Sequence, residues 1–480
     1  MSTALAGTAM PPLDTAAIDW VSEDPHLSGN FAPIGPEIDA ADLPVTAGRI
    51  PPDLRGAHMR NGPNPRFKPI AYAYPMDGDG MVHAVFFEGG RARYRNRYVR
   101  TRGLAAERRA GRALYGSLFH PVPVDPALLG EDGEPGPIKT GAFINVLQHG
   151  GHLIAFGEAQ PAYEMTMELD TIGEWTAGTG EVVEMGAHNR RHPVTGDLYA
   201  IAYSALEPVV RVHRIDAAGT LRDSFPVPLA APSMIHDFVL TERHLVLLIG
   251  PAVFDMEAAG KGGSFLQWRP SLGTRIGLVP LDGGAVTWLE AEPFFVFHFA
   301  NGFERGRRIV LDYVRHDGLH VGPSSGPVPP PMLHRMVIDP AARSLREERL
   351  ADFVTEFPRI NDARTARESR FIYLPTRTGT LAMERPPSST FNAVVKVDAE
   401  TGATRQHDAG NRVLGEPVFI PRAASGAEDD GYLITYAYDP STGTSDLLLL
   451  DAARIEEAPV AVIRMPQRVP QGLHGNWMPG

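Results

Sequence analysis

Most of this chain, from about residue 138 to the end, alternates between short apolar segments and tight turns of one kind. Each turn begins with aspartate or with a histidine–proline pair and ends with glycine, which is the chemistry of β-turns. These turns lie at residues 192–196, 216–219, 282–284, 398–402 and 439–443. The segments between them are about five to eight residues long, without intervening helical patterns. This regularity predicts an all-β fold: a sandwich, a barrel or a propeller.

The clearest strands that this pattern predicts lie at residues 198–203, 209–215, 245–249, 274–279, 308–313, 393–397, 432–436 and 446–450. So many strands need protected edges, and radial repetition around an axis provides them over several hundred residues. The 480 residues show no clean sequence repeat and neither the WD nor the kelch signature. We therefore expect a propeller whose blades have diverged.

Three segments stand apart from this rhythm. Residues 81–87 and 91–99 flank a Glu-Gly-Gly turn and predict a hairpin. Residues 103–119 are rich in alanine and arginine, have an apolar flank and predict a helix. Residues 251–273 are too long for a hairpin loop and carry the large apolar residues Phe254, Met256, Phe265, Leu266 and Trp268. They either cover the core or form an exposed patch that takes up an apolar ligand.

The composition excludes several classes of function. There is no cysteine, which removes disulfides, thiolate metal sites, iron–sulfur clusters and thiol nucleophiles. The net charge is −12 without any run of lysine or arginine, so nucleic acid is not an expected partner. The N-terminus lacks the features of a signal peptide, and no apolar run reaches the roughly 18 residues of a transmembrane helix. We expect a soluble, cytoplasmic protein.

Four histidines stand in surroundings that are unusual for a surface residue. His236 and His298 lie in apolar segments, and glycines lie beside His188 and His474. A single histidine of this kind is more simply a buried core residue. Because the four are far apart in the chain, only the fold could bring them together, and the inner strands of a propeller converge on one axis. We interpret the four as ligands of one metal ion.

The remaining histidines are expected to have other roles. His83 lies in a strand-like segment and is expected to be a satisfied core or lining residue. Six stand in polar, turn-like surroundings and are expected to be exposed to solvent: His26, His149, His152, His316, His320 and His407.

Three glutamates, Glu158, Glu356 and Glu416, occupy apolar, strand-like segments. A buried glutamate needs a partner, and a metal-bound histidine normally donates its other ring N–H to an acceptor such as a carboxylate. A sheet edge or a salt bridge explains each glutamate taken singly. Together with the four histidines, the three form a coherent metal centre.

Several longer motifs occur in order along the chain: RNGPNPRF (60–67), DGDGMVHAVFF (77–87), YRNRYVRT (94–101), AHNRRHPVTGDL (187–198), MIHDFVLT (234–241), EFPRIN (356–361), GEPVFIPR (415–422) and LHGNW (473–477). They resemble the carotenoid cleavage oxygenase family, which also includes bacterial enzymes that cleave stilbenes and phenylpropenoids. The resemblance implies a seven-bladed β-propeller with a cap of loops and short helices over the top face. It also implies an N-terminal extension at residues 1–28 and a single propeller domain at 29–480, with cap segments at about 103–135 and 251–273.

The resemblance further implies which residues form the centre. The family holds one Fe(II) through four histidines, which correspond here to His188, His236, His298 and His474. Three carboxylates outside them correspond to Glu158, Glu356 and Glu416, with the expected partners His236, His298 and His474. Four neutral imidazoles favour a borderline metal such as iron and leave two positions for dioxygen and an alkene. No catalytic acid or base is expected.

The implied reaction is oxygen insertion across an electron-rich C=C bond, which gives two carbonyl products. We expect a carotenoid or apocarotenoid substrate, because relatives that bind phenols carry a lysine where this chain has Gly157. A stilbene or a propenylphenol is the alternative. The residues expected to line the pocket are Tyr98, Ile144, Met76 and Phe303. Ile144 stands where many relatives have threonine, and Met76 where they have an aromatic residue.

Two other classes of protein stay open. One is a propeller that binds isoprenoids without catalysis. The other is a propeller hydrolase with calcium on its axis, although calcium would need oxygen ligands rather than imidazoles. The helix at 103–119 and the segment 251–273 are candidates for contact with a membrane surface or the mouth of the substrate tunnel. Such contact would place a cytoplasmic protein at the inner face of the membrane.

Overall fold

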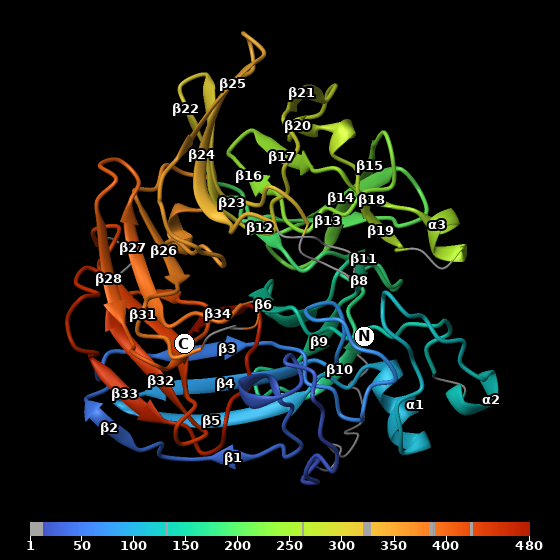
Figure 1. Ribbon diagram of the computed structural model, residues 1–480. Coiled ribbons are helices and arrows are strands. Elements are labelled where there is room, and N and C mark those ends of the chain that lie inside the picture. The colour runs from blue at the N-terminus through green and yellow to red at the C-terminus, as the bar shows by residue number, and fades with distance from the viewer. Residues whose placement is uncertain are drawn as a thin grey trace, which may run out of the picture.

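The computed structural model describes residues 13–130, 133–261, 264–319, 328–383, 387, 389–422 and 426–480. Most of its strands form seven antiparallel sheets arranged around a common axis (Figure 1), so the fold is a β-propeller, as the strand pattern predicts, with the seven blades that the family resemblance implies. We number the blades 1 to 7, beginning with the blade that contains the predicted hairpin.

From the outermost to the innermost strand, blade 1 contains β1 (Asp39–Ala40), β5 (Arg91–Tyr98), β4 (Met81–Glu88), β3 (Gly56–Arg60) and β34 (Gly475–Pro479). Blade 2 contains β10 (Thr171–Glu174), β9 (Tyr163–Met165), β7 (His152–Phe156) and β6 (Asn145–His149). Blade 3 contains β15 (Leu221–Pro228), β14 (Val209–Ile215), β13 (Leu198–Tyr203) and β12 (Asn189–Arg191). Blade 4 contains β21 (Thr287–Ala291), β20 (Thr274–Pro280), β17 (His244–Ile249) and β16 (Val239–Leu240).

Blade 5 contains β25 (Ser344–Arg349), β24 (Met332–Asp339), β23 (Arg308–Arg315) and β22 (Phe299–Arg305). Blade 6 contains β28 (Thr404–Asp408), β27 (Ala393–Asp398) and β26 (Phe371–Thr376). Blade 7 contains β2 (Val45–Gly48), β33 (Ala461–Arg464), β32 (Thr444–Asp451), β31 (Gly431–Asp439), β29 (Val413–Leu414) and β30 (Val418–Pro421). Two short sheets lie outside the blades: β8 (Gln160–Pro161) with β11 (Glu184–Met185), and β18 (Ala252–Phe254) with β19 (Leu266–Trp268).

Blade 6 has an irregular inner edge. Residues 355–359 lie where an innermost strand would stand, and they pair with β26 only through the isolated bridges Thr355–Thr376 and Arg359–Tyr373. This segment carries Glu356. Its irregular backbone therefore becomes important for the site.

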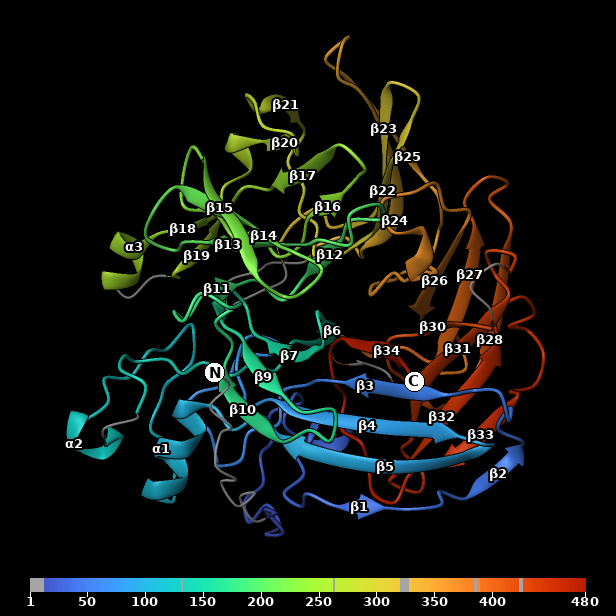
Figure 2. The ribbon, with the colours of Figure 1, turned by 180° about the vertical axis from the view of Figure 1, so that it is seen from behind.

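The two ends of the chain close the ring. The C-terminal strand β34 pairs with β3 in register from Gly56–Pro479 to Arg60–Gly475. The early strand β2 pairs instead with β33 in blade 7. Figures 1 and 2 show the blue β3 and the red β34 side by side from both directions. The last strand is thus part of the propeller and not a frayed end, and it carries the histidine segment to the axis.

The hydrophobic core is divided among the spaces between blades. Val85 and Phe87 of blade 1, for example, pack with Ile434 and Leu449 of blade 7 in one buried cluster. A strand between two such clusters is buried on both faces, and the middle of β31 is almost wholly buried. This explains the continuous apolar segments of the sequence, because strict alternation is expected only where one face meets water.

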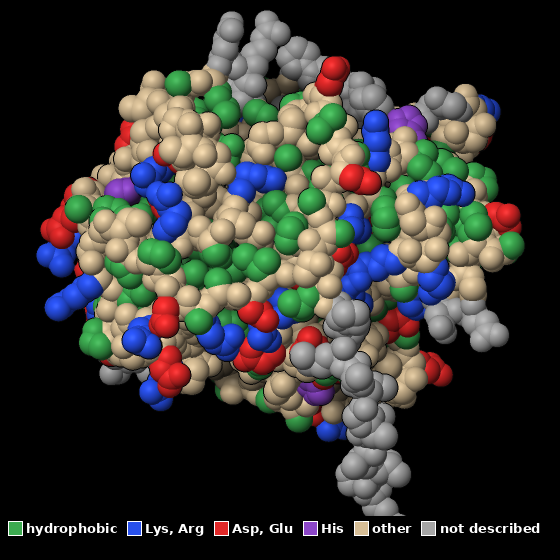
Figure 3. Space-filling view, turned by 90° about the horizontal axis from the view of Figure 1, so that it is seen from below, with side chains coloured by type: hydrophobic (Ala, Val, Ile, Leu, Met, Phe, Trp, Pro, Cys, Tyr) green, Lys and Arg blue, Asp and Glu red, His purple; other side chains and the backbone are tan. Residues whose placement is uncertain are grey.

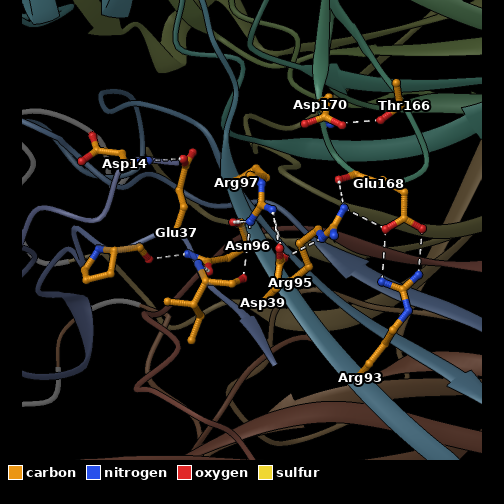
Figure 4. Close-up of polar contacts among 12 residues, drawn as sticks. Asp14, Glu37, Asp39, Arg93, Arg95, Asn96, Arg97, Thr166, Glu168 and Asp170 are labelled. Carbon is orange, nitrogen blue, oxygen red and sulfur yellow. Dashed lines mark hydrogen bonds and ion pairs between the residues drawn. The ribbon is translucent and has the colours of Figure 1, made fainter. Parts of the chain in front are cut away.

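Polar contacts add a link between blades 1 and 2 (Figure 4). Arg93, Arg95 and Arg97 point to one side of β5, as residues two apart in a strand do. Arg95 Nε lies 2.6 Å from Asp39 of β1, and Arg95 Nη1 lies 2.8 Å from Glu168 in the turn between β9 and β10. Arg93 also reaches Glu168, at 2.8 Å. From below, acidic and basic side chains lie close together over much of the surface (Figure 3).

The predicted strands are confirmed, and the observed bounds differ from the predicted ones by at most a few residues. The predicted helix is correct only in its first half. Helix α1 (Arg102–Ala110) begins after Thr101, whose side chain accepts a hydrogen bond from Leu104 N–H, and ends at Gly111 in the left-handed conformation, φ 67°. Beyond it the chain turns back, and Leu114 packs onto Ala106. The alanine-rich composition predicted a helix that continues past Gly111, although glycine at this position is a common helix end.

The segment 251–273 forms part of a cap. It contains β18, β19, the short helix α3 (Met256–Gly260) and a 3₁₀ turn, Pro270–Leu272. Together with α1 and α2 (Pro126–Leu129), α3 lies on one side of the propeller, at the right in Figure 1. Two further 3₁₀ turns lie at Gly29–Phe31 and Asp362–Arg364. Among the described residues, no helix has the length and the apolar composition needed to span a bilayer.

The apolar side chains of this segment belong to what we call the cap cluster. Its buried members are Met234, Ala252, Phe254, Leu266, Phe295 and Leu319, with Met76, Phe119, Tyr203, Ala205, Phe265, Trp268 and Phe297 packed against them. Met256 and Leu272 of the same segment stay half exposed, at 50% and 53%. The segment therefore covers the core and also presents apolar side chains to solvent.

Of the expected N-terminal extension, residues 1–12 lie outside the described part of the chain. From residue 13 onward the segment packs against the propeller, and hydrogen bonds of Asp14 hold it in place. The carboxylate of Asp14 accepts a hydrogen bond from Arg66 at 2.8 Å and one from Arg108 of α1 at 2.9 Å. Its backbone N–H donates to Glu37 at 2.7 Å.

Candidate metal centre

Four buried histidines meet on the propeller axis. His188, His298 and His474 each directly precede the innermost strand of a blade, namely β12, β22 and β34, and His236 lies shortly before β16. Each residue offers one ring nitrogen, and these atoms all lie within 4.8 Å of one another. The histidines are between 5% and 8% exposed. The same position, repeated in blades 1, 3, 4 and 5, thus brings four remote segments to one point.

The rings are arranged around a common centre and not in a stack. The ring centroids of His188 lie 4.6, 5.0 and 4.5 Å from those of His236, His298 and His474, at interplanar angles between 64° and 78°. Nε2 of His298 is buried and has no hydrogen-bond partner among the described residues. Such an atom normally has a partner, and Nε2 of His188 and of His236 also approach each other, to 3.1 Å. A cation between the rings would satisfy all of these nitrogens.

Two of the three predicted glutamates hydrogen-bond to the outer nitrogens of two rings. Nδ1 of His298 bonds to Oε2 of Glu356, and Nδ1 of His474 lies 2.9 Å from Oε1 of Glu416. Oε2 of Glu416 also accepts the backbone N–H of Gly475 at 2.9 Å. Each carboxylate thereby fixes the orientation of its ring and leaves the other nitrogen facing the centre.

The third glutamate approaches its ring differently. Oε2 of Glu158 lies 2.6 Å from Nδ1 of His236, but the N–H direction is not aligned with that oxygen, so the contact is an ion-pair approach and not a formed hydrogen bond. Glu158, Glu356 and Glu416 belong to blades 2, 6 and 7. Every blade therefore contributes either a histidine or a glutamate to the centre. The structure pairs each glutamate with the histidine that the sequence assigned to it.

The fourth ring, that of His188, has no glutamate. Its Nδ1 lies 4.0 Å from Oδ1 of Asp237, beyond hydrogen-bond distance. The carboxylate of Asp237 is held instead by Arg190 at 2.6 Å and by the backbone N–H of Phe299 at 2.9 Å. His188 is thus the one ring of the four whose orientation depends mainly on packing.

Electrostatics keep His188 and His298 neutral and Glu356 and Glu416 charged, whereas the neighbouring Glu158 outweighs burial and raises the pKa of His236. Burial, reinforced by the three neighbouring rings, lowers the pKa of His188 well below its ordinary value. Burial alone would raise the pKa of Glu416, but Arg359, His474 and the N–H of Gly475 outweigh it and hold the pKa at about 2. Burial is likewise outweighed at Glu356, whose pKa is lowered by His298 and His316. Neutral imidazole is the form that binds a metal.

The donor set fits a first-row transition metal. Four imidazole nitrogens without carboxylate or carbonyl oxygens at the centre suit iron, cobalt, nickel, copper or zinc and not calcium or magnesium. The carboxylates lie outside the ring of nitrogens, where they can offset the charge of a divalent ion.

The expectation that six other histidines are exposed is wrong for two of them. His316 is buried, and its Nε2 lies 2.8 Å from Oε1 of Glu356, so this carboxylate is shared between two histidines. His149 is buried and bonds to the carbonyl oxygen of Asp216 at 2.6 Å. Both residues lie in polar, turn-like sequence, and they are buried because residues of a neighbouring blade pack against them. The remaining described members of that set are half-buried (His26, His152 and His407), and His320 lies outside the described residues.

His83 is satisfied in the core as predicted: its Nδ1 lies 2.7 Å from the hydroxyl oxygen of Tyr94. A further residue near the centre, Phe357, is not predicted from the sequence. The ring of Phe357 lies against His298 with centroids 5.0 Å apart and an interplanar angle of 27°. The neighbouring Glu356 was recognised, but nothing in the sequence indicates that both consecutive side chains reach the axis.

The residues expected to line the pocket separate into two groups. Ile144 lies beside the centre, because its carbonyl oxygen accepts the N–H of His474 at 3.0 Å, and Met76 packs on the cap cluster. Tyr98 is placed elsewhere, since its hydroxyl bonds to Asn64 at 2.7 Å and to the carbonyl oxygen of Ile34 at 3.0 Å. Phe303 is buried within β22 and lies 5.6 Å below the guanidinium of Arg305.

The centre has an apolar side and a polar side. The cap cluster reaches it through Phe297, whose ring centroid lies 5.5 Å from that of His236 and 4.7 Å from that of Phe295. A separate cavity of about 790 Å³, which we call the axial cavity, is lined by His188, His298 and His474 and by the innermost strands β6, β12, β16, β22 and β34. No residue of the cap cluster lines it.

Fold and site together define a class of protein: a seven-bladed propeller whose axis holds four buried imidazoles backed by carboxylates. The sequence model of one family, described as retinal pigment epithelial membrane protein, matches residues 31–479. A carotenoid cleavage oxygenase of Mycobacterium tuberculosis is 33% identical, over 95% of this chain and 98% of that protein. The chain belongs to this family of carotenoid cleavage oxygenases, and it is an enzyme of the dioxygenase class.

Solved structures agree with the assignment. The crystal structure of Pseudomonas brassicacearum lignostilbene dioxygenase superposes with a TM-score of 0.85 at 30% identity, covering 95% of this chain and 99% of that one. The structure of cobalt-substituted Synechocystis apocarotenoid oxygenase superposes with a TM-score of 0.83 at 28% identity, covering 96% and 99%.

Proposed function

We propose that this protein is an Fe(II)-dependent dioxygenase that cleaves one conjugated C=C bond of a carotenoid or apocarotenoid. The observation that carries the proposal is the convergence of four buried ring nitrogens within 4.8 Å of one another, at the inner end of an apolar cluster. The reaction balances as alkene plus O₂ giving two carbonyl compounds, with one oxygen atom in each. No proton has to be removed from the substrate, so the site needs no catalytic base.

The residues of the chain would each contribute to holding the reactants. His188, His236, His298 and His474 would hold Fe(II), which when bound leaves two coordination positions for dioxygen and the alkene. Glu356 and Glu416 orient two of the rings through hydrogen bonds, and Glu158 lies 2.6 Å from Nδ1 of a third. Phe297 places an aromatic wall against the ring of His236 and keeps water from the cap side of the centre, and Phe357 packs against the ring of His298.

Two observations favour a polyene over a phenolic alkene. The position before Glu158, where phenol-binding relatives carry lysine, is Gly157, and a carbon atom added there would lie 2.5 Å from the side-chain oxygen of Gln160. The hydroxyl of Tyr98 is already used by Asn64 and Ile34. The cap cluster, which reaches the ring of His236 through Phe297, is an apolar region beside the centre of the kind that a polyene would contact.

A stilbene or propenylphenol is the alternative substrate, and the likeness to lignostilbene dioxygenase favours it. Incubation of iron-loaded protein with an apocarotenal and with a hydroxystilbene, in separate reactions, tests both. The expected result is oxygen uptake and two aldehydes from the polyene only. Aldehydes from the hydroxystilbene alone would support the alternative.

The same experiment under ¹⁸O₂ tests the class of reaction. A dioxygenase incorporates one labelled atom into each carbonyl product, provided that products are trapped before exchange with water. The variant His474→Ala serves as the inactive control. Substrate binding without oxygen uptake by iron-loaded protein would favour an isoprenoid-binding propeller instead. Metal analysis that finds calcium would favour the hydrolase.

We further propose that the cap side contacts the inner face of the cytoplasmic membrane. Its support is the group of half-exposed apolar residues Leu128 of α2, Met256 of α3 and Leu272. Figure 3 shows apolar side chains next to basic ones at the right edge, on the side of α1 and α2. Sedimentation with anionic vesicles tests this: Met256→Glu combined with Leu272→Glu should reduce binding, while Val194→Glu, remote from the cap, should not.

A further inference from the structure

We propose that the axial cavity is the route by which ferrous ion enters the centre, so that metal and apolar substrate approach from different sides. The inference rests on the proposed metal site. Two different regions adjoin the four histidines. Phe297 and the cap cluster cover one side, whereas the axial cavity opens on the rings of His188, His298 and His474.

A divalent cation travels with its water. Moving an ion from water into apolar surroundings carries a very large desolvation cost, so the packed apolar side chains of the cap cluster are effectively closed to it. At about 30 Å³ of liquid per water, an ion with six waters needs roughly 200 Å³. The axial cavity has about 790 Å³ and so offers room for a hydrated ion.

The lining of the axial cavity changes continuously from exposed to buried. Val194 and Thr195, in the turn between β12 and β13, and Ala363, in the 3₁₀ turn Asp362–Arg364, line it and are exposed to solvent; Val194 is 70% exposed. The deepest lining residues are the ring histidines, of which His188 and His474 are 5% exposed. The cavity therefore connects the surface to the ring nitrogens.

Most charges along this path are paired. Among the cavity's residues, Arg190 is paired with Asp237 at 2.6 Å, and Arg359 lies 3.4 Å from Glu416 and 3.5 Å from Asp362. Of the two other arginines that line it, Arg367 lies 3.8 Å from Glu242, and Arg191 donates a hydrogen bond to the carbonyl oxygen of Gln148. Paired arginines repel a cation far less than free ones do. Asparagine side chains on β6, β12, β22 and β34 supply amide oxygens between the charged pairs, and a hydrated hard cation is compatible with oxygen donors.

Because the chain has no cysteine, one introduced thiol can be labelled selectively. We choose Ala363→Cys at the mouth of the axial cavity and Met256→Cys on the exposed side of α3, which does not line it. Thr195→Cys, across the mouth, is a second mouth variant. Each protein is studied metal-free, before and after attachment of a bulky polyethylene glycol maleimide. The unlabelled sample of the same variant is the control for folding.

The measurements are the rate of cobalt(II) binding, followed by its visible absorption, and the rate of cobalt release to a chelator. An obstruction raises the barrier in both directions without changing the end states. Labelling at the mouth should therefore slow association and release by the same factor, roughly ten-fold or more, and leave Kd unchanged. Labelling at Met256→Cys should change neither rate.

Two outcomes would overturn the inference, and they differ. The variant Thr195→Cys/Ala363→Cys, labelled at both thiols, blocks the mouth most fully. If the rates of cobalt association and release stay unchanged in this variant and in both single mouth variants, while one cobalt still binds, the route is rejected and the metal site is kept. Cobalt binding that survives His474→Ala, or that never occurs, would reject the metal site itself and the proposed function with it.

Discussion

The aromatic ring of Phe357 lies nearly parallel to the imidazole of His298, with ring centroids 5.0 Å apart. The preceding residue, Glu356, bonds to Nδ1 of the same imidazole. Consecutive side chains of a regular strand point to opposite faces. Here both reach one ring because Phe357 adopts a left-handed conformation, φ 51°. Such a conformation costs a bulky residue about 1–2 kcal/mol, and strain of this kind tends to occur at functional sites.

Phe357→Leu should loosen the ring of His298 while keeping most of the apolar volume. We expect bound cobalt to be released several-fold faster to a chelator, with a change in unfolding free energy below about 1.5 kcal/mol. The chelator assay and the midpoint of urea unfolding measure the two effects. Unaltered release would mean that Glu356 alone fixes the ring.

Glu356→Gln should weaken metal binding by about 10–100-fold, because the carboxylate orients His298 and offsets the charge of the ion. The matched control is Glu304→Gln, since Glu304 also lies beside a histidine, His244, at 3.1 Å but far from the axis. Competition with a chelator of known affinity gives both values. Equal affinities for the two variants would contradict the role assigned to Glu356.

His474→Ala should abolish stoichiometric metal binding while the propeller stays folded. His83→Ala removes a histidine that is buried equally well but bonds to Tyr94, and it should keep one metal ion per chain. Metal analysis after dialysis, with circular dichroism for folding, distinguishes the two. Deleting residues 470–480 is a less specific test, because it also removes β34 from blade 1.

Glu347→Gln should remove a pH-dependent contribution to stability in blade 5. Burial raises the pKa of Glu347, but His334, Tyr313 and Arg315 outweigh this and hold it at about 2. A depressed carboxyl pKa stabilises the folded state above the unfolded-state pKa of about 4.5, and this contribution disappears as the pH falls toward 2. Because Glu347 is partly exposed, solvent screening reduces the contribution, and the variant should lose about 1 kcal/mol at pH 7 and about half of that near pH 3.3.

The unfolding free energy of metal-free wild type and Glu347→Gln, measured by urea at several pH values, provides this comparison. The test is whether the difference in unfolding free energy between the two proteins becomes smaller as the pH falls. A deficit that is independent of pH between 7 and 3 would show that the variant loses packing and not a charge interaction.

Local sequence was sufficient for much of the fold. The turns that end in glycine indicated where the strands begin and end, because glycine readily adopts the positive φ that such turns require. Gly196, Gly219, Gly402 and Gly443 all have positive φ. The helix prediction failed past Ala110 because alanine-rich composition outweighed the single stop at Gly111. The irregular inner edge of blade 6 had no signal either, since its few bridges depend on what the neighbouring blades leave room for.

For the candidate site, the motifs identified the seven residues and their pairing, and the structure brings those residues together. They did not indicate that His316 is buried against Glu356, that Tyr98 turns its hydroxyl toward Asn64, or that Phe357 reaches the axis. Each of these facts depends on the packing of segments that are distant in the chain.

The sequence by itself determined the type of structure, because turn chemistry and strand composition act over a few residues and are written locally. It also determined which side chains could bind a metal. Only the tertiary structure decided that four imidazoles face one point, that an apolar cluster covers one of them, and that a cavity of mixed polar and apolar lining opens on the other three. These are relationships between blades, and they exist only after the last strand has paired with the first sheet.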